Sequence, residues 1–187
     1  MTFDDLLKNR RTIRNYKDDP VSVELIQEMI QESTLAPSAG NGQPWQFIIV
    51  NNKEMIKTLS DESKQNLLNR IAQDPNDYAV RYKGMLEKIP NVFYNAPSLV
   101  IIGGNKNLKN LYLDCALAGC YFMMAVASRN MGTCWVNLGA EIHDPDLRKR
   151  LGMTDDFQIV APITVGYPVV IPSAPKRNEI EILKVID

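Results

Sequence analysis

The first third of the chain mixes apolar and polar residues with a helical period. Thr2 and Asp5 have the spacing of a capping box, which predicts a first helix that ends near the basic residues 10–14. Ser22 is expected to cap a second helix, which runs to about Thr34 and places its apolar residues on one face. Two helices are therefore expected before the first loop.

The pattern changes at residue 45, where aromatic and β-branched residues follow one another. Residues 45–50 predict a buried strand, and residues 96–104 predict a second strand that is fully buried. Asn52 is expected to cap a third helix between these strands, with one apolar face and an ordinary exposed face. Residues 133–136 predict a short strand and residues 157–165 predict a final one.

The most apolar segment, residues 108–131, predicts a helix that is buried on nearly all sides. Asp114 interrupts this segment, which argues against a membrane span of roughly 18 uninterrupted apolar residues. The small residues within it would let another helix approach closely. Two interpretations remain open at this point, namely the core of a dimer and the central helix of a monomer.

Length and charge restrict the function further. A chain of 187 residues without repeats or linkers fits one domain, 1–187. Its formal net charge of −1 does not favour nucleic acid or an anionic membrane as a partner, and its acidic N-terminus is unlike a signal peptide, so a cytoplasmic protein is expected. Cys115, Cys120 and Cys134 are odd in number and have apolar neighbours, which predicts reduced, structural core thiols. A single histidine, His143, argues against a zinc site and a Ser-His-Asp set, so a cofactor is expected to carry the chemistry.

The loop that precedes residue 45 has the composition of a binding site. Its closely spaced prolines and glycines exclude a regular helix and let backbone N–H groups approach a ligand. Ser38, Asn41 and Gln43 can each donate and accept hydrogen bonds, as a planar heteroaromatic ligand requires. The alternative is a plain connection in which Asn and Gly only satisfy the turn geometry.

A basic run, RRTIRNY, occupies residues 10–16. Arg10, Arg11 and Arg14 repel one another unless an anion or carboxylates lie between them, and guanidinium groups bind phosphate in a bidentate manner. A phosphate site is therefore one interpretation. A solvated basic surface at the end of the first helix is the other.

Taken together, RRTIR and the later APSAGNGQPW resemble the opening motifs of the nitroreductase family of FMN-dependent oxidoreductases, and the resemblance extends nearly from end to end. It implies an α+β sandwich with a central mixed, mostly antiparallel sheet flanked by helices. It also implies a homodimer with FMN sites at the subunit interface and extended C-terminal arms that wrap the partner. NADH or NADPH would bind transiently over the flavin, and hydride would pass to a small electron-poor acceptor such as a nitroaromatic or a quinone.

The resemblance also implies a set of cofactor contacts. The arginine run would hold the phosphate and the pyrimidine side of the flavin, the loop would contact the flavin from the partner subunit, and the two C-terminal basic residues would close on the phosphate. The backbone around Gly139 would face flavin N5. The implied contacts are Arg10, Arg11, Thr12, Arg14, Pro37, Ser38, Ala39, Asn41, Gln43, Leu138, Gly139, Lys176 and Arg177.

Residues 73–95 are unusually aromatic for a connecting segment. They are expected either to pack on the core or to form a lid over the flavin, and Lys88 is the candidate there for a lysine near a flavin carbonyl. Two other functions also remain open at this stage. One is a flavin-dependent reductase of an enone or a halogenated aromatic, and the other is a non-catalytic FMN carrier.

Overall fold

The computed structural model describes residues 2–187. Its sheet has the strand order β1-β2-β4-β3, and every pair of neighbouring strands is antiparallel. The strands are β1 (Gln46–Val50), β2 (Ser98–Asn105), β3 (Gly132–Trp135) and β4 (Phe157–Gly166). The expected mostly antiparallel sheet is confirmed. The parallel pairing among the described residues is confined to the isolated bridge between Thr12 and Thr133.

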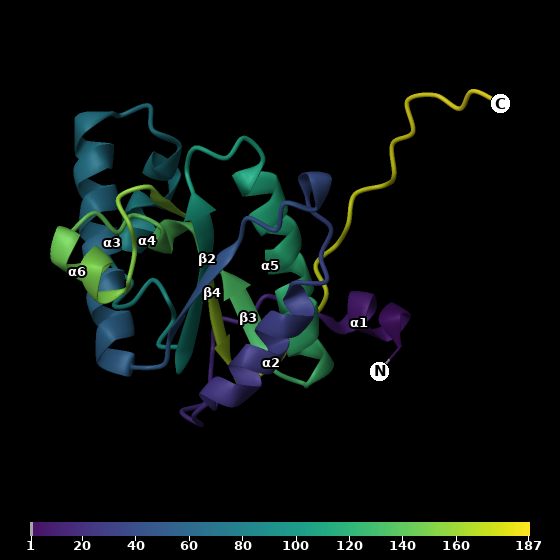
Figure 1. The fold of residues 1–187 in the computed structure, drawn as a ribbon, viewed down its shortest axis with the longest axis horizontal. Helices are drawn as coiled ribbons and strands as arrows, with labels where there is room; N and C mark the ends of the chain where they lie inside the picture. The colour runs from purple at the N-terminus through teal and green to yellow at the C-terminus, as the bar shows by residue number, and fades with distance from the viewer. Residues whose placement is uncertain (1) are drawn as a thin grey trace.

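Helices cover both faces of the sheet, as Figure 1 shows. α2 and α5 lie on one face, and α3, α4 and α6 lie on the other. The α-helices are α1 (Phe3–Asn9), α2 (Val23–Ser33), α3 (Lys53–Gln73), α4 (Lys83–Leu86), α5 (Leu111–Ser128) and α6 (Pro145–Arg150). Short 3-10 turns are η1 (Ala39–Asn41), η2 (Tyr78–Tyr82) and η3 (Asn137–Gly139). The predicted α+β sandwich is confirmed.

The helix starts follow from local hydrogen bonds that the sequence predicts. Thr2 and Asp5 form a complete capping box at α1. The side chains of Ser22 and Asn52 accept the backbone N–H three residues on, at 3.2 and 2.8 Å, and so begin α2 and α3. These three predictions are confirmed.

The strands differ in burial because they differ in position within the sheet. β2 is central and is buried at every residue except Asn105, as expected. β1 is an edge strand, in which Val50 is buried and the other residues are partly or fully exposed. The prediction of a buried strand at residues 45–50 is therefore wrong for most of β1, since its pattern does not reveal that one edge lacks a neighbour.

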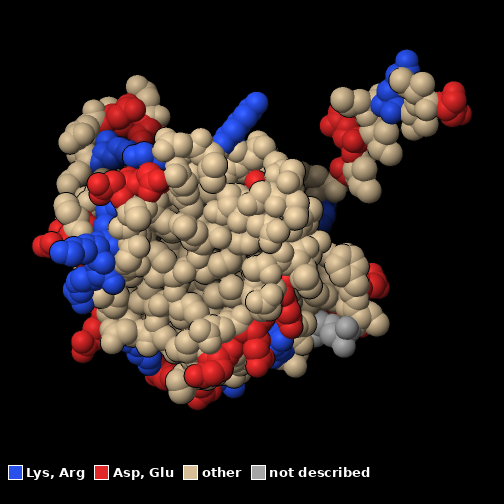
Figure 2. Space-filling model, in the orientation of Figure 1, with Lys and Arg blue, Asp and Glu red and all other residues tan. Residues whose placement is uncertain are grey.

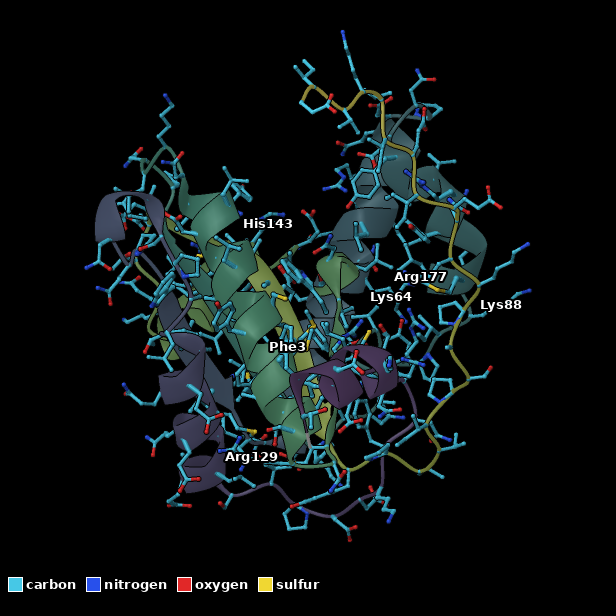
Figure 3. The ribbon with its side chains drawn as sticks, turned by 90° about the vertical axis from the view of Figure 1, so that its right-hand side faces the viewer. Phe3, Lys64, Lys88, Arg129, His143 and Arg177 are labelled. Atoms are coloured by element: carbon cyan, nitrogen blue, oxygen red, sulfur yellow. The ribbon has the colours of Figure 1, made fainter. Side chains whose placement is uncertain are left out.

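α5 is buried on one side only, which corrects the expectation for residues 108–131. It packs on the sheet and on α2, but Tyr112, Leu113, Leu117, Cys120 and Tyr121 are exposed. α5 is long and apolar enough to cross a membrane by composition, yet 39% of it is buried inside the protein. Figure 3 shows α5 uncovered along much of its length. Figure 2, which shows the molecule from the side turned by 90°, has few charged residues at its centre. We call the exposed surface of α5 that these five residues form, Tyr112, Leu113, Leu117, Cys120 and Tyr121, the α5 face.

The three cysteines differ in burial. Cys115 and Cys134 are buried, as expected for core thiols, whereas the expectation is wrong for Cys120, which lies on the α5 face. Burial raises the pKa of the Cys115 thiol to about 12, with a smaller contribution from the Asp114 carboxyl. Burial also raises the pKa of the Cys134 thiol, although Arg14 opposes this shift. Both buried thiols therefore stay protonated and unreactive near neutral pH.

The C-terminal tail, residues 169–187, is extended and exposed and leaves the body of the protein (Figure 1). Its root is fixed where Tyr16 pairs with Pro168 and where Lys17 N–H donates to Tyr167 O at 2.8 Å. Beyond this point the tail forms no strand. The extended tail has the form expected of an arm, and its wrapping of a partner subunit stays a prediction.

Candidate cofactor site

The basic run lies beside β3. Ile13 N–H donates to Thr133 O at 2.8 Å, and the Ile13 side chain is buried. A Cβ atom at Gly132 would lie 2.4 Å from Ile13, so only glycine permits this close approach. Because the Ile13 side chain is buried in the core, the side chains of its neighbours Thr12 and Arg14 point elsewhere. The backbone of Thr12 is held by its bridge to Thr133.

The three arginines open onto two cavities. Arg10 and Arg11 line a small one of about 70 Å³ between α1, the C-terminal end of α5 and the root of the tail. Arg14 lines a larger one of about 710 Å³, which we call the main cavity. Within residues 2–187, none of the three forms an ion pair with a carboxylate. Their charges are therefore available to an anion from outside the chain.

The main cavity combines aromatic, apolar and cationic groups. Its lining contains no carboxylate, and its two cations are Arg14 and Lys88. The guanidinium of Arg14 stacks on the Tyr94 ring at 5.7 Å, which fixes its position. The residues that line the cavity are Arg14, Tyr82, Met85, Lys88, Ile89, Tyr94, Cys134, Trp135, Val136, Asn137 and Leu138. The structure thus brings together Arg14, Leu138 and Lys88 from the sequence-based set.

The 136–141 loop, which contains η3, forms one wall of this cavity. Gly139 N–H donates to Val136 O at 2.8 Å, whereas the N–H groups of Asn137 and Leu138 have no partner among the described residues. A Cβ atom at Gly139 would lie 2.2 Å from the Phe93 ring, so glycine is required here by packing. The unpaired donors beside Gly139, rather than Gly139 itself, are available to a ligand.

Three residues of the 37–43 loop have positive φ angles. Gly40, Asn41 and Gln43 have φ angles of +57°, +55° and +44°. Residues other than glycine seldom adopt such angles, so the backbone is strained at Asn41 and Gln43. Gln43 N–H donates to Ser38 Oγ at 3.0 Å, and the Gln43 amide donates to Asn41 Oδ1 at 3.1 Å. Part of the expected hydrogen-bonding capacity is therefore used within the loop. Pro37 and Ala39 of the same loop are exposed.

This loop and the small cavity lie at opposite ends of α5. Ala39 N–H donates to Asp114 in the first turn of α5 at 3.0 Å, whereas Arg10 and Arg11 lie beside Ala127 near its last turn. A helix of 18 residues is about 27 Å long at 1.5 Å per residue. One chain therefore does not bring its own loop to its own Arg10 and Arg11.

The C-terminal pair, Lys176 and Arg177, lies on the exposed tail. Figure 3 shows Arg177 on this extended segment, apart from α1 and the N-terminal end of the chain. Of the tail and its root, Pro168 and Ile171 reach the small cavity. The structure therefore does not gather the basic pair with the arginine run.

Residues 78–94 both pack on the core and line the cavity. Phe93 is fully buried, whereas Tyr82 and Tyr94 line the main cavity and Tyr78 is half exposed. Packing on the core is confirmed for Phe93, whereas the lid over the flavin stays a prediction. Lys88 is exposed at the cavity mouth and lies at the edge of the molecule in Figure 3.

Sequence reasoning missed a polar stripe on α3. It consists of Ser60, Ser63, Asn66 and Arg70, whose spacing of three, three and four residues places them on one side of the helix. The two serines are fully buried. Their helical spacing beside apolar residues was a usable signal, but the contacts that they make come from distant parts of the chain.

Comparison with known proteins assigns the family. The Nitroreductase family model matches residues 7–167, so the chain belongs to the nitroreductase family. A protein of Archaeoglobus fulgidus, provisionally named NADH dehydrogenase/NAD(P)H nitroreductase, is 29% identical over 87% of this chain and 83% of the relative. Iodotyrosine deiodinase 1 of Rattus norvegicus is 26% identical over 89% of this chain and 62% of the relative. The crystal structure of a nitroreductase with bound FMN from Desulfitobacterium hafniense has a TM-score of 0.78 at 22% identity, and the match covers 98% of this chain and 100% of that one.

Proposed function

We propose that this protein is an FMN-dependent oxidoreductase that transfers hydride from NADH or NADPH to a small electron-poor acceptor, such as a nitroaromatic or a quinone. The observation that carries the proposal is that three arginines without carboxylate partners among the described residues line cavities. One of these cavities is also lined by Asn137 and Leu138, whose backbone N–H groups are unpaired among the described residues. Such a donor set fits a dianionic phosphate and a heteroaromatic ring. Family membership and the names of its relatives support the same reaction class.

Each part of the site has a distinct role in this proposal. Arg10 and Arg11 bind the phosphate, and Arg14 compensates negative charge that develops at the pyrimidine side of the ring. The N–H groups of Asn137 and Leu138 orient the ring at the opposite wall. FMN held by these residues would supply the hydride-transfer chemistry between the nicotinamide and the acceptor. Donor and acceptor alternate in the main cavity, since the chain has no G-x-G-x-x-G motif for a separate nicotinamide site.

We further propose that the working unit is a homodimer. The α5 face is a continuous apolar surface of a kind that marks association. A two-fold axis across the middle of α5 would exchange its ends, and it would bring the 37–43 loop of one chain to the arginines of the partner. The exposed tail, which carries Lys176 and Arg177, could then reach the partner's site as an arm.

The first experiment identifies the cofactor and the activity. We expect purified protein to be yellow and to release FMN rather than FAD on unfolding. We also expect oxidation of NADH or NADPH that depends on the concentration of nitrobenzene or of a quinone. A flavin-free protein would overturn the proposal. Bound FMN with slow reduction and no dependence on the acceptor would instead indicate a carrier.

A second reaction, reductive dehalogenation of a halogenated aromatic, is favoured by one observation. A relative of this chain is named iodotyrosine deiodinase 1. Halide release from a halogenated phenol, compared with reduction of a nitrophenol of similar size, separates the two reactions. Whichever substrate gives the higher kcat/KM identifies the preferred acceptor.

The three cysteines provide a test of whether a partner subunit covers the α5 face. We expect Cys120 to react slowly with a maleimide in the native protein, although it is exposed in the single chain, because the partner buries it. Cys115 and Cys134 are buried within the chain and should also react slowly. Mass spectrometry of protein labelled before and after unfolding measures all three. Lys83→Cys on exposed α4 is the positive control, and rapid native labelling of Cys120 would contradict a covered α5 face.

A further inference from the structure

The polar stripe of α3 holds the 136–141 loop from behind. The Ser63 hydroxyl donates to Leu138 O at 2.8 Å and accepts from Glu141 N–H at 3.0 Å. Asn66 extends the contact, since its amide donates to Glu141 O at 2.9 Å. A buried hydroxyl is tolerated only when it is hydrogen-bonded, and Ser63 is fully satisfied at both ends of the loop. Leu138 is thereby fixed on its carbonyl side by α3, while its N–H remains unpaired.

The same stripe holds the segment that forms the other wall. Ser60, one turn before Ser63, accepts the Val92 N–H at 2.9 Å. Val92 is flanked by Ile89 and Tyr94, which line the main cavity. At the far end of the stripe, Arg70 pairs with Glu141 of the loop and, at 2.8 Å, with Asp77, which caps η2. One rigid helix therefore fixes two walls that are far apart in sequence.

We propose that Ser63 and Ser60 are positioning residues with separate tasks, and this inference rests on the proposed function. Ser63 holds Leu138 so that its unpaired N–H stays directed to the flavin. Ser60 holds the 78–94 segment, which contacts the acceptor. Neither serine lines the main cavity, so each acts through the backbone to which it bonds.

The two tasks predict different defects. Without its hydroxyl partner, the Leu138 carbonyl is released and the 136–141 loop loses an anchor to α3. The Leu138 N–H, which belongs to the preceding peptide, is then held less firmly, and this weakens binding of the electron-rich reduced flavin. We expect Ser63→Ala to weaken binding of reduced FMN about tenfold relative to oxidised FMN, since one such hydrogen bond contributes about that factor. A tenfold change corresponds to a midpoint potential about 30 mV lower for a two-electron couple. Ser60→Ala should instead raise KM for the acceptor and leave the potential unchanged.

The experiment compares three buried serines in the full-length protein. Ser33→Ala is the matched control, because Ser33 is equally buried and donates to Ile30 O at 2.6 Å on α2, across the sheet from α3. The midpoint potential is measured by spectroscopic titration, and KM and kcat are measured with nitrobenzene as acceptor. Thermal unfolding reports how much stability each variant loses. Ser63→Cys retains a weak donor of similar size and should recover part of the potential shift.

The outcomes distinguish the inference from the function on which it rests. Wild-type protein that binds no FMN would overturn the proposed function. Wild-type protein that binds FMN, together with an unchanged potential in both Ser63→Ala and Ser63→Cys, would overturn the positioning role alone. Potential shifts in all three variants, Ser63→Ala, Ser60→Ala and Ser33→Ala, that scale with their losses of stability would also overturn it, because they would show a general structural effect.

Discussion

Replacing Arg14 with alanine should remove most of the bound FMN. The side chain lines the main cavity, stacks on Tyr94 and has no carboxylate partner among the described residues, so its charge is free to interact with the cofactor. A charge-assisted hydrogen bond contributes about 1.5–3 kcal/mol, which corresponds to roughly ten- to a hundredfold in affinity. Arg10→Ala should have an effect of similar size at the phosphate. Fluorescence titration of the apoprotein with FMN measures both dissociation constants.

Arg150→Ala is the matched control for these variants, since Arg150 is exposed at the end of α6 and lines neither the main nor the small cavity. It removes the same charge and should bind FMN as the wild type does. Near-wild-type FMN occupancy of both Arg10→Ala and Arg14→Ala at micromolar protein would contradict the proposed arginine roles. Loss of FMN in the Arg150→Ala variant as well would indicate a general electrostatic effect rather than a site.

Local features of the fold could be predicted because they depend on neighbouring residues. Helix caps at Thr2, Ser22 and Asn52 act within three residues, and the buried pattern of β2 reflects its own apolar run. The segment between α2 and β1 forms no α-helix, as its closely spaced glycines and prolines indicate. In each case the signal and the structure that it specifies lie in the same short segment.

Features that depend on distant contacts could not be predicted in the same way. A strand pattern does not show whether a strand has one neighbour or two, so β1 was expected to be more buried than it is. Ser63 is an ordinary serine of an amphipathic helix until Leu138 is placed beside it. Cys120 has apolar neighbours in sequence, but they belong to an exposed helix face. Such positions are decided by tertiary packing rather than by local pattern.

The candidate site shows both kinds of outcome. Arg14 and Leu138 were expected to act together and do line one cavity, although they are far apart in sequence. The 37–43 loop lies at the other end of α5 from Arg10 and Arg11, so the expectation that these parts share one flavin remains a prediction about two chains.

Two inactive variants should restore activity to each other when their chains are combined. The first carries Arg10→Ala and Arg14→Ala, and the second carries Pro37→Gly and Asn41→Ala in the loop. If each site uses the arginines of one chain and the loop of its partner, a mixed dimer has one site with both lesions and one intact site. The two chains are unfolded together, refolded with FMN and assayed by acceptor-dependent NADH oxidation.

Random pairing makes half of the dimers mixed, and each mixed dimer has one intact site of two. Up to about a quarter of the wild-type activity per total protein should therefore return. Each variant refolded alone is the control and should stay inactive, because its two sites carry the same lesion. Two variants that both alter the arginine run should not restore each other, since every site in their mixture carries a lesion in that run. Mixed dimers that form, as shown by native mass spectrometry, but remain inactive would count against the shared site. Full wild-type activity of a monomer at micromolar concentration would exclude it, because a single chain holds the loop and Arg10 at opposite ends of α5.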